Sequence, residues 1–257
     1  MQHNIELIPP VKRARGYRLY TESRRFVDLY LDGGRAVLGH NAPNVLRELK
    51  NAADRSLFAS YPSYYTKRFE KALSLLFPGK SFAAYRSMEA VPSAIKNTTP
   101  LVRPYMSSSG IENGTEPFLA VLPHPLAPVV LVTNPQAEFV TGSTTEQERG
   151  ADNASRLLIS PVILALTTRA IYDVLHTPER GTVVFKRVEE ALAAGSWRRT
   201  GIYVTPKEKM TDTEWDRIFK RFLDAGFLLP PTSHDPLILP GELSPGEEKQ
   251  LAECCAR

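Results

Sequence analysis

Near its N-terminus the chain reads Arg15-Gly-Tyr-Arg-Leu-Tyr20, then Phe26-Val-Asp-Leu-Tyr30, and then Leu38-Gly-His-Asn-Ala-Pro-Asn-Val45. The first two pieces are rich in aromatic and aliphatic residues and are separated by the polar pair Glu22-Ser23. This pattern predicts two or three short strands, with a second turn at Asp32-Gly-Gly34. In the third piece a proline follows a polar cap and precedes apolar residues at helical spacing, which predicts a helix.

Further elements follow toward the middle of the chain. A helix is predicted over residues 63–77, where apolar residues recur on one face before Pro78-Gly79. Two apolar runs bounded by prolines, 118–122 and 129–132, predict buried strands. The rest of residues 80–154 reads as irregular. Ser160-Pro161 then opens a long predicted helix that reaches about His176.

The C-terminal third carries the clearest local signals. Thr211-Asp-Thr-Glu214 and Ser244-Pro-Gly-Glu247 are capping boxes, each of which predicts the start of a helix. Another helix is predicted from about Pro178 to Gly195. The predicted strands of this third are 201–205, 227–229 and 237–239.

Composition narrows the class of protein. The 257 residues are 42% hydrophobic and 23% charged, as in an ordinary soluble globular protein of one large domain or two unequal ones. The net charge of +4 is a weak case for nucleic-acid binding, and no apolar run is long enough for a membrane helix or a signal peptide. The adjacent pair Cys254-Cys255 excludes a disulfide scaffold, and the scattered histidines exclude a zinc site. We therefore expect a cytoplasmic protein with no metal, no nucleic-acid partner and no membrane partner.

Taken in order, these pieces resemble the class III aminotransferases, a group that includes glutamate-1-semialdehyde aminomutase. The likeness covers about half of the chain, in the stretches 15–45, 160–175 and 222–248. It implies the α/β fold of the pyridoxal-phosphate-dependent transferases of fold type I. The small domain would be α+β and built from both chain ends. Because the chain is far shorter than these enzymes, much of the large domain would be missing, which leaves a reduced α/β core.

The resemblance also implies a division of the chain and a quaternary state. Residues 1–60 would form the N-terminal part of the small domain and an interface segment, 61–176 the reduced large-domain core, and 177–257 the C-terminal part of the small domain. Fold-type I active sites form between two subunits, so a homodimer is implied.

Three residue requirements of the cofactor are altered in this chain. The phosphate of pyridoxal phosphate sits on backbone amides at a helix start, and the matching stretch Arg86-Ser-Met-Glu-Ala90 lacks the family's glycine and threonine. Asn134 stands where the resemblance places the aspartate that pairs with the pyridine nitrogen. No lysine occurs between Lys96 and Lys186, where the Schiff-base lysine is expected.

These departures predict an aminotransferase-like protein with no cofactor and no catalytic residues, which works by binding a small molecule or a protein. The expected ligand-binding residues are Tyr61, Tyr64, Arg86, Ser87 and Asn134.

Two enzymatic alternatives stay open. The first is a pyridoxal-phosphate-dependent aminotransferase or aminomutase that acts on an amino acid through Lys96, Lys186 or Lys207. Its phosphate would be held by Arg86 or by the loop Ser107–Ser109. The second is a cofactor-independent enzyme that pairs Glu89 with a histidine.

Some other polar residues carry weaker hypotheses. The basic residues between Lys12 and Arg25 either receive a carboxylate or phosphate or form a solvated face. His40 is expected to satisfy backbone polar groups rather than to catalyse. Ser107–Gly114 is either a phosphate-binding loop or a surface turn.

Overall fold

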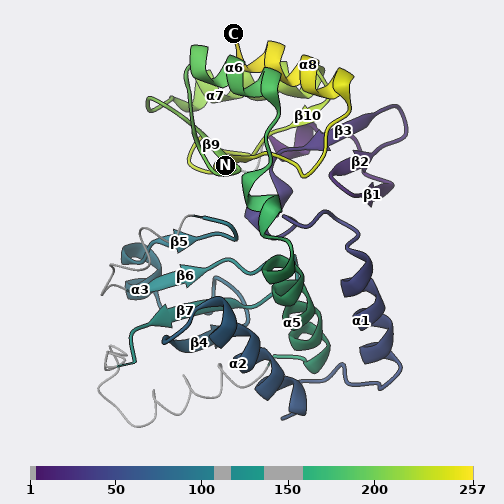
Figure 1. Ribbon diagram of the computed structural model, residues 1–257, viewed down its shortest axis with the longest axis vertical. Coiled ribbons are helices and arrows are strands. Elements are labelled where there is room, and N and C mark those ends of the chain that lie inside the picture. Colours follow the sequence, from purple (N-terminus) through teal and green to yellow (C-terminus); the bar gives the residue numbers. More distant parts are fainter. Residues whose placement is uncertain (1–3, 107–116, 136–158, 257) are drawn as a thin grey trace. The chain divides into compact units, whose positions relative to one another are not determined.

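The computed structural model describes residues 4–106, 117–135 and 159–256 (Figure 1). The chain forms two compact units. The terminal unit comprises Met1–Ala42, Tyr105–Ser107 and Thr177–Arg257, and the central unit comprises Pro43–Pro104 and Ser108–His176. Both chain ends thus belong to one unit, while the finer division into 1–60, 61–176 and 177–257 stays a prediction. No helix of the described residues is long and apolar enough to cross a membrane.

The terminal unit contains a four-stranded sheet made from both chain ends. β1 (Arg13–Arg15), β2 (Arg18–Tyr20) and β3 (Arg25–Asp28) are antiparallel neighbours, and β10 (Phe227–Leu228) lies parallel to β3. The short strands predicted around these positions are therefore confirmed. Two 3-10 turns lie along the chain on either side of these strands. η1 (Ile5–Leu7) precedes β1, and η2 (Leu31–Gly34) follows β3.

A second sheet of the terminal unit is antiparallel, in the order β11-β9-β8. It consists of β8 (Trp197–Thr200), β9 (Tyr203–Pro206) and β11 (Leu237–Ile238). α6 (Lys186–Ala194) and α7 (Asp212–Asp224) contact α8 (Pro245–Cys255). Both capping boxes are confirmed: the side chains of Thr211 and Ser244 accept from the backbone N–H of Glu214 and Glu247.

The helix predicted from Pro178 to Gly195 is wrong in its first half. The structure has a 3-10 turn, η4 (Pro178–Thr182), and α6 begins only at Lys186. Between them Val183 and Phe185 have non-helical backbone angles, with ψ of 136° and 105°. Two valines and a phenylalanine in succession have low helix propensity, so the chain leaves the helical conformation there.

The central unit is built on a sheet in the order β4-β7-β6-β5. Its strands are β4 (Ser81–Tyr85), β5 (Leu101–Val102), β6 (Phe118–Ala120) and β7 (Val129–Thr133), and its helices are α1 (Pro43–Ala53), α2 (Tyr64–Leu76), α3 (Ser93–Thr98) and α5 (Pro161–His176). The predicted elements at α1, α2, α5, β6 and β7 are confirmed. The prediction that the remainder of 80–154 is irregular is wrong for β4, α3 and β5.

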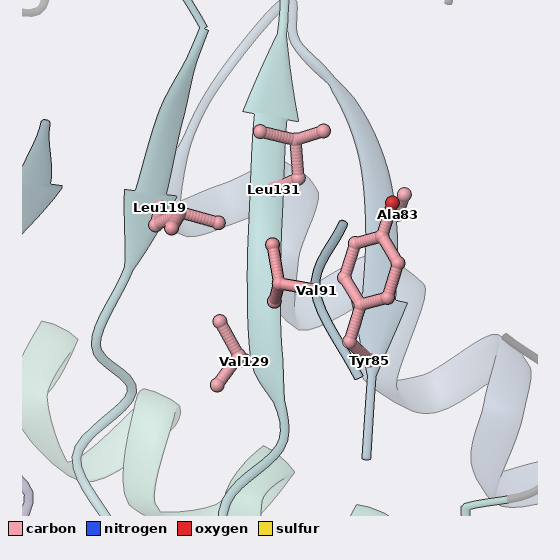
Figure 2. Packing of buried hydrophobic residues seen from close by; sticks show 6 residues of the cluster. All are labelled: Ala83, Tyr85, Val91, Leu119, Val129 and Leu131. Carbon is pink, nitrogen blue, oxygen red and sulfur yellow. The ribbon is translucent and has the colours of Figure 1, made fainter. Parts of the chain in front are cut away.

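One face of this sheet carries a compact apolar cluster. Ala83 and Tyr85 of β4 lie opposite Leu131 and Val129 of β7, and Leu119 of β6 joins them from the other side (Figure 2). Val91 closes the cluster, with Met88, Ile95 and Leu101 packed against it. At the end of α2, Phe77 packs edge-on against Phe118 with ring centroids 5.3 Å apart. Burial of every residue of β7 thus explains why its sequence is a continuous apolar run.

Most of the predicted basic cluster in the terminal unit is engaged within the chain. Arg18 holds Glu247 through two hydrogen bonds of 3.0 and 2.8 Å and Glu242 through a third of 2.8 Å. Arg25 and Lys12 also pair with glutamates, and the guanidinium groups of Arg13 and Arg24 lie over aromatic rings. These contacts favour neither an open anion site nor a purely solvated face. The hydrogen bond from Arg18 lowers the pKa of Glu247 to about 2.

Glu247→Gln tests this ion pair because it removes the charge but keeps an oxygen for the Ser244 amide. We expect the free energy of unfolding at pH 7 to fall by about 2 kcal/mol. The folded pKa of about 2 lies below the ordinary 4.5, so the contribution is present above pH 4.5 and is lost as the pH falls toward 2. Urea unfolding followed by tryptophan fluorescence measures it, since both tryptophans lie in the terminal unit.

The matched control is Glu214→Gln, at the same position of the other capping box. Glu214 is exposed and its hydrogen bonds go to Thr211, while Arg217 acts on it through its charge alone. We expect a smaller loss there. Equal losses for the two variants, or a loss that does not shrink at acid pH, would contradict the role given to the Arg18 pair.

Candidate functional site

The stretch Arg86–Ala90 follows the end of β4 and forms turns instead of a helix start. The amides of Ala90 and Val91 donate to the carbonyls of Ser87 and Met88, at 3.2 and 3.3 Å. α3 begins only at Ser93, and Pro92 is its cap residue. These two amides are therefore used in turns, and residues 86–90 do not open a helix whose amides could face an anion.

The side chains of the same stretch are also engaged. Arg86 Nη2 lies 3.5 Å from Ser60 Oγ. Ser87 donates a hydrogen bond to Glu89, and this bond lowers the pKa of that carboxyl. A carboxyl with a lowered pKa is a poorer general base near pH 7, which weakens the pairing of Glu89 with a histidine.

Asn134 directly follows β7, at a sheet end where Lys80 is its partner. Lys80 Nζ donates to Asn134 Oδ1 at 2.5 Å. The two residues meet because Lys80 precedes β4, and Ser81 of β4 pairs with Thr133 of β7. The Asn134 amide oxygen therefore already accepts from an ammonium group of the chain.

Strand direction separates the predicted ligand-binding residues. β4 and β7 are antiparallel, with Tyr85 opposite Val129. Arg86 and Ser87 therefore leave the sheet at the end where β7 begins, while Asn134 lies at the end where β7 stops. Five residues of strand at ~3.4 Å each place these ends about 17 Å apart. The structure thus does not bring the phosphate-cup match and Asn134 to one point.

Tyr61 and Tyr64 lie near the start of α2 beside arginines that sequence reasoning did not single out. Arg55 Nη1 donates to the Tyr64 hydroxyl at 2.6 Å, and Arg68 lies over the rings of Tyr64 and Tyr65. The two rings are 4.3 Å apart. Tyr65 is buried, which raises its pKa to about 12, whereas the hydrogen bond from Tyr65 lowers the pKa of Tyr64.

The aromatic residues of this region are unusually exposed. Tyr61 is 65% exposed, Tyr64 50% and Phe58 60%. Arg86 reaches the same segment through Ser60. We call residues 55–68 together with Arg86 the aromatic–arginine surface. It includes three of the five predicted ligand-binding residues, Tyr61, Tyr64 and Arg86; Ser87 is next to it in sequence and Asn134 is not part of it.

The three lysines proposed as alternative Schiff-base residues are all exposed. Lys96 lies on α3, Lys186 begins α6, and Lys207 follows β9 and donates to the carbonyl of Gly195 at 2.7 Å. The loop Ser107–Gly114, including the phosphate-binding alternative Ser107–Ser109, lies outside the described residues. Among the described residues no cluster of three acidic, histidine or cysteine side chains is arranged to hold a metal.

The terminal unit corrects the expectation for His40 and shows the environment of the two cysteines. The His40 side chain lies 2.8 Å from Asp28 Oδ2, so its partner is a carboxylate and the expected pairing with backbone groups is wrong. Asp28 Oδ1 in turn accepts from the amides of Tyr30 and Leu31 and fixes that turn. Cys254 and Cys255 are buried and form no disulfide, and burial raises the pKa of Cys255 to about 12. A thiol with so high a pKa is unreactive, which agrees with a structural role.

Comparison with known proteins supports the fold. No family model matches the chain. An uncharacterized protein of Treponema pallidum (strain Nichols) is 26% identical over 276 residues, which cover 90% of this chain and 88% of that protein. Ornithine delta-aminotransferase of Plasmodium falciparum superposes with a TM-score of 0.66 at 13% identity, over 97% of this chain and 93% of the enzyme.

A glutamate-1-semialdehyde-aminomutase of Pseudomonas aeruginosa PAO1 gives a TM-score of 0.64 at 10% identity, over 96% of this chain and 86% of that one. The chain has the α/β fold of the pyridoxal-phosphate-dependent transferases. At these identities the likeness concerns the fold alone. The particular subfamily and the reduction of the large domain stay predictions.

Asn134→Asp tests the contact at the end of β7, because it would turn the Lys80 hydrogen bond into an ion pair. We expect the central unit to gain about 0.5–1 kcal/mol of stability at pH 7. The gain should vanish below about pH 4, where the new carboxyl is protonated. Asn134→Ala is the control and should lose about 1 kcal/mol. Thermal unfolding followed by circular dichroism measures both, and equal destabilisation by the two variants would contradict the Lys80 contact.

Proposed function

We propose that this protein has the fold of an aminotransferase but no pyridoxal phosphate chemistry, and that it works by binding. The observation that carries the proposal is the strand register of the central unit. It puts Arg86 and Ser87 at one end of the sheet and Asn134 at the other, a separation too long for one pyridoxal phosphate to bridge. In addition, Lys80 Nζ already donates a hydrogen bond to Asn134 Oδ1.

The Schiff-base requirement points the same way. The sequence has no lysine between Lys96 and Lys186. A lysine that forms an aldimine at neutral pH needs a lowered pKa, which burial or a cationic neighbour supplies. Lys96, Lys186 and Lys207 are exposed and lack a burying environment. The alternative, a pyridoxal-phosphate enzyme acting on an amino acid through an unusual lysine, has Lys80 as a further candidate because it is half-buried and adjoins Asn134.

The aromatic–arginine surface supports a binding role. Exposed Tyr61, Tyr64 and Phe58 lie within seven residues of one another, next to arginines. Tyrosine and arginine are the residue types enriched where proteins contact one another, because both combine apolar area with directed hydrogen bonds. The occupant we propose is a second copy of the chain, in line with the homodimer that the resemblance implies.

Incubation with pyridoxal phosphate followed by borohydride reduction and peptide mapping tests the absence of Schiff-base chemistry. Reduction converts any aldimine into a stable adduct on the lysine that formed it. We expect only scattered, substoichiometric labelling of exposed lysines. A stoichiometric adduct on one lysine that Lys→Ala substitution removes would overturn the proposal and identify the reactive residue.

Sedimentation velocity of the double variant Tyr61→Ala/Tyr64→Ala tests the proposed self-association. Because truncated interface tyrosines commonly cost more than ~1.4 kcal/mol, we expect the dissociation constant of the dimer to rise at least tenfold. The control is Leu126→Ala, another exposed apolar residue of the central unit, which should leave it unchanged. A wild-type protein that stays monomeric, or a double variant that dimerises normally, would rule out this surface as the contact.

A further inference from the structure

The aromatic–arginine surface carries positive charge and no carboxylate. Residues 55–68 contain Arg55, Lys67 and Arg68 but neither aspartate nor glutamate, and Arg86 adds a fourth cation. Its formal charge of +4 equals the net charge of the whole chain, so the other residues of the chain are neutral in sum. The excess positive charge of the protein therefore corresponds to this one surface.

Two of these cations meet at one exposed tyrosine. Arg55 Nη1 donates to the Tyr64 hydroxyl at 2.6 Å, and the guanidinium carbon of Arg55 is 5.9 Å from the centre of the Tyr64 ring. The guanidinium carbon of Arg68 is 5.8 Å from the same ring centre. The pKa of Tyr64 is lowered by hydrogen bonds from three side chains: Tyr65, Arg68 and Arg55. Two guanidinium groups thus reach a single phenol oxygen.

No carboxylate of the described residues forms an ion pair with these two arginines. The ion pairs found there involve neither Arg55 nor Arg68, and Glu48 acts on Arg55 only through its charge. Both arginine side chains are exposed, and the hydrogen bonds of Arg55 to the two tyrosines use Nη1 alone. A guanidinium group has five N–H donors, so donors are left for a further acceptor.

This charge opposes a direct contact between two copies. In a two-fold symmetric dimer the same surface of both copies meets, so four cations would face four others. Like charges that face each other across an interface cost several kcal/mol. A doubly charged anion between the arginines would offset this repulsion, because guanidinium groups bind tetrahedral oxyanions with paired N–H donors.

We propose that a doubly charged oxyanion of the phosphate class binds at Arg55 and Arg68 and links two copies of the chain at the aromatic–arginine surface. This anion site rests on the proposed self-association through the same surface. The arginines of both copies donate hydrogen bonds to the anion, so the site is complete only in the dimer. Self-association and anion binding therefore strengthen each other.

Sedimentation velocity of the full-length protein at pH 7.5 tests this link in three sodium salts of equal ionic strength: phosphate, sulfate and chloride. Equal ionic strength gives equal screening, so a difference between the salts reports bound anion. We expect the dissociation constant of the dimer to be about tenfold lower in phosphate or sulfate than in chloride. Linkage gives this factor for two sites per dimer when the anion is at about twice its own dissociation constant.

A pair of charge-matched double variants locates the anion. Arg55→Gln/Arg68→Gln removes the guanidinium groups, and its dimer should have dissociation constants in phosphate and chloride that agree within about twofold. Lys50→Gln/Lys71→Gln is the control, since it changes the net charge equally at two exposed lysines outside the aromatic–arginine surface. This control should keep the tenfold difference between the salts.

Three results would contradict the anion link and leave self-association in place. The first is a dimer of equal strength in all three salts. The second is a dimer that phosphate weakens, which would indicate an acidic surface opposite the arginines. The third is a phosphate effect that persists in Arg55→Gln/Arg68→Gln. A protein that stays monomeric in every salt would overturn both the anion link and the proposed self-association.

Discussion

Contacts between the two chain ends hold the terminal unit together. Arg180 joins the carbonyl of Val37, from the N-terminal segment, to that of Leu239, from the C-terminal segment. Strand β10, from the C-terminal segment, pairs with β3 and completes the first sheet. Arg18 of β2 donates hydrogen bonds to Glu247 of α8. The central unit lies between these two segments in sequence. Bringing the segments together therefore costs conformational entropy, which local secondary structure does not offset. The hydrogen bonds of buried or half-buried arginines determine which segments pair. Apolar contacts alone would allow the segments to shift along one another.

In the central unit, strand direction is the corresponding constraint. A resemblance in sequence predicts residue types and their order along the chain. It does not predict whether a strand pairs with its neighbour in parallel or antiparallel. Because β4 runs antiparallel to β7, residues that follow β4 and residues that follow β7 point to opposite ends of the sheet. The same pairing brings Lys80, which precedes β4, to Asn134. The register thus replaces one expected cluster of ligand-binding residues with a lysine–amide contact and a separate exposed surface.

Elements with strong local signals were predictable from sequence, and elements that depend on distant partners were not. The capping boxes at Thr211 and Ser244 are satisfied within four residues, so their sequence determines them. β4 reads Ser-Phe-Ala-Ala-Tyr, with two alanines that have little intrinsic preference for a strand, and it forms because β7 is beside it. Tyr61 and Tyr64 were singled out from sequence, but Arg55 and Lys80 were not, since their partners are nine or more residues away.

The same distinction bears on function. The chemistry of a fold depends on a few residues brought to one point, whereas a pocket depends on how a unit closes on itself. A cofactor site in this chain would require a lysine to lie at one point with three other residues, Arg86, Ser87 and Asn134. The register of the central sheet holds Asn134 at the opposite end from Arg86 and Ser87. A pocket requires only that the segments of the terminal unit pack around Arg180. The hydrogen bonds of Arg180 are among the contacts that hold these segments together. If the proposed loss of pyridoxal phosphate chemistry holds, the terminal unit would still keep a pocket lined by charged residues, because the contacts that stabilise this unit also shape the pocket.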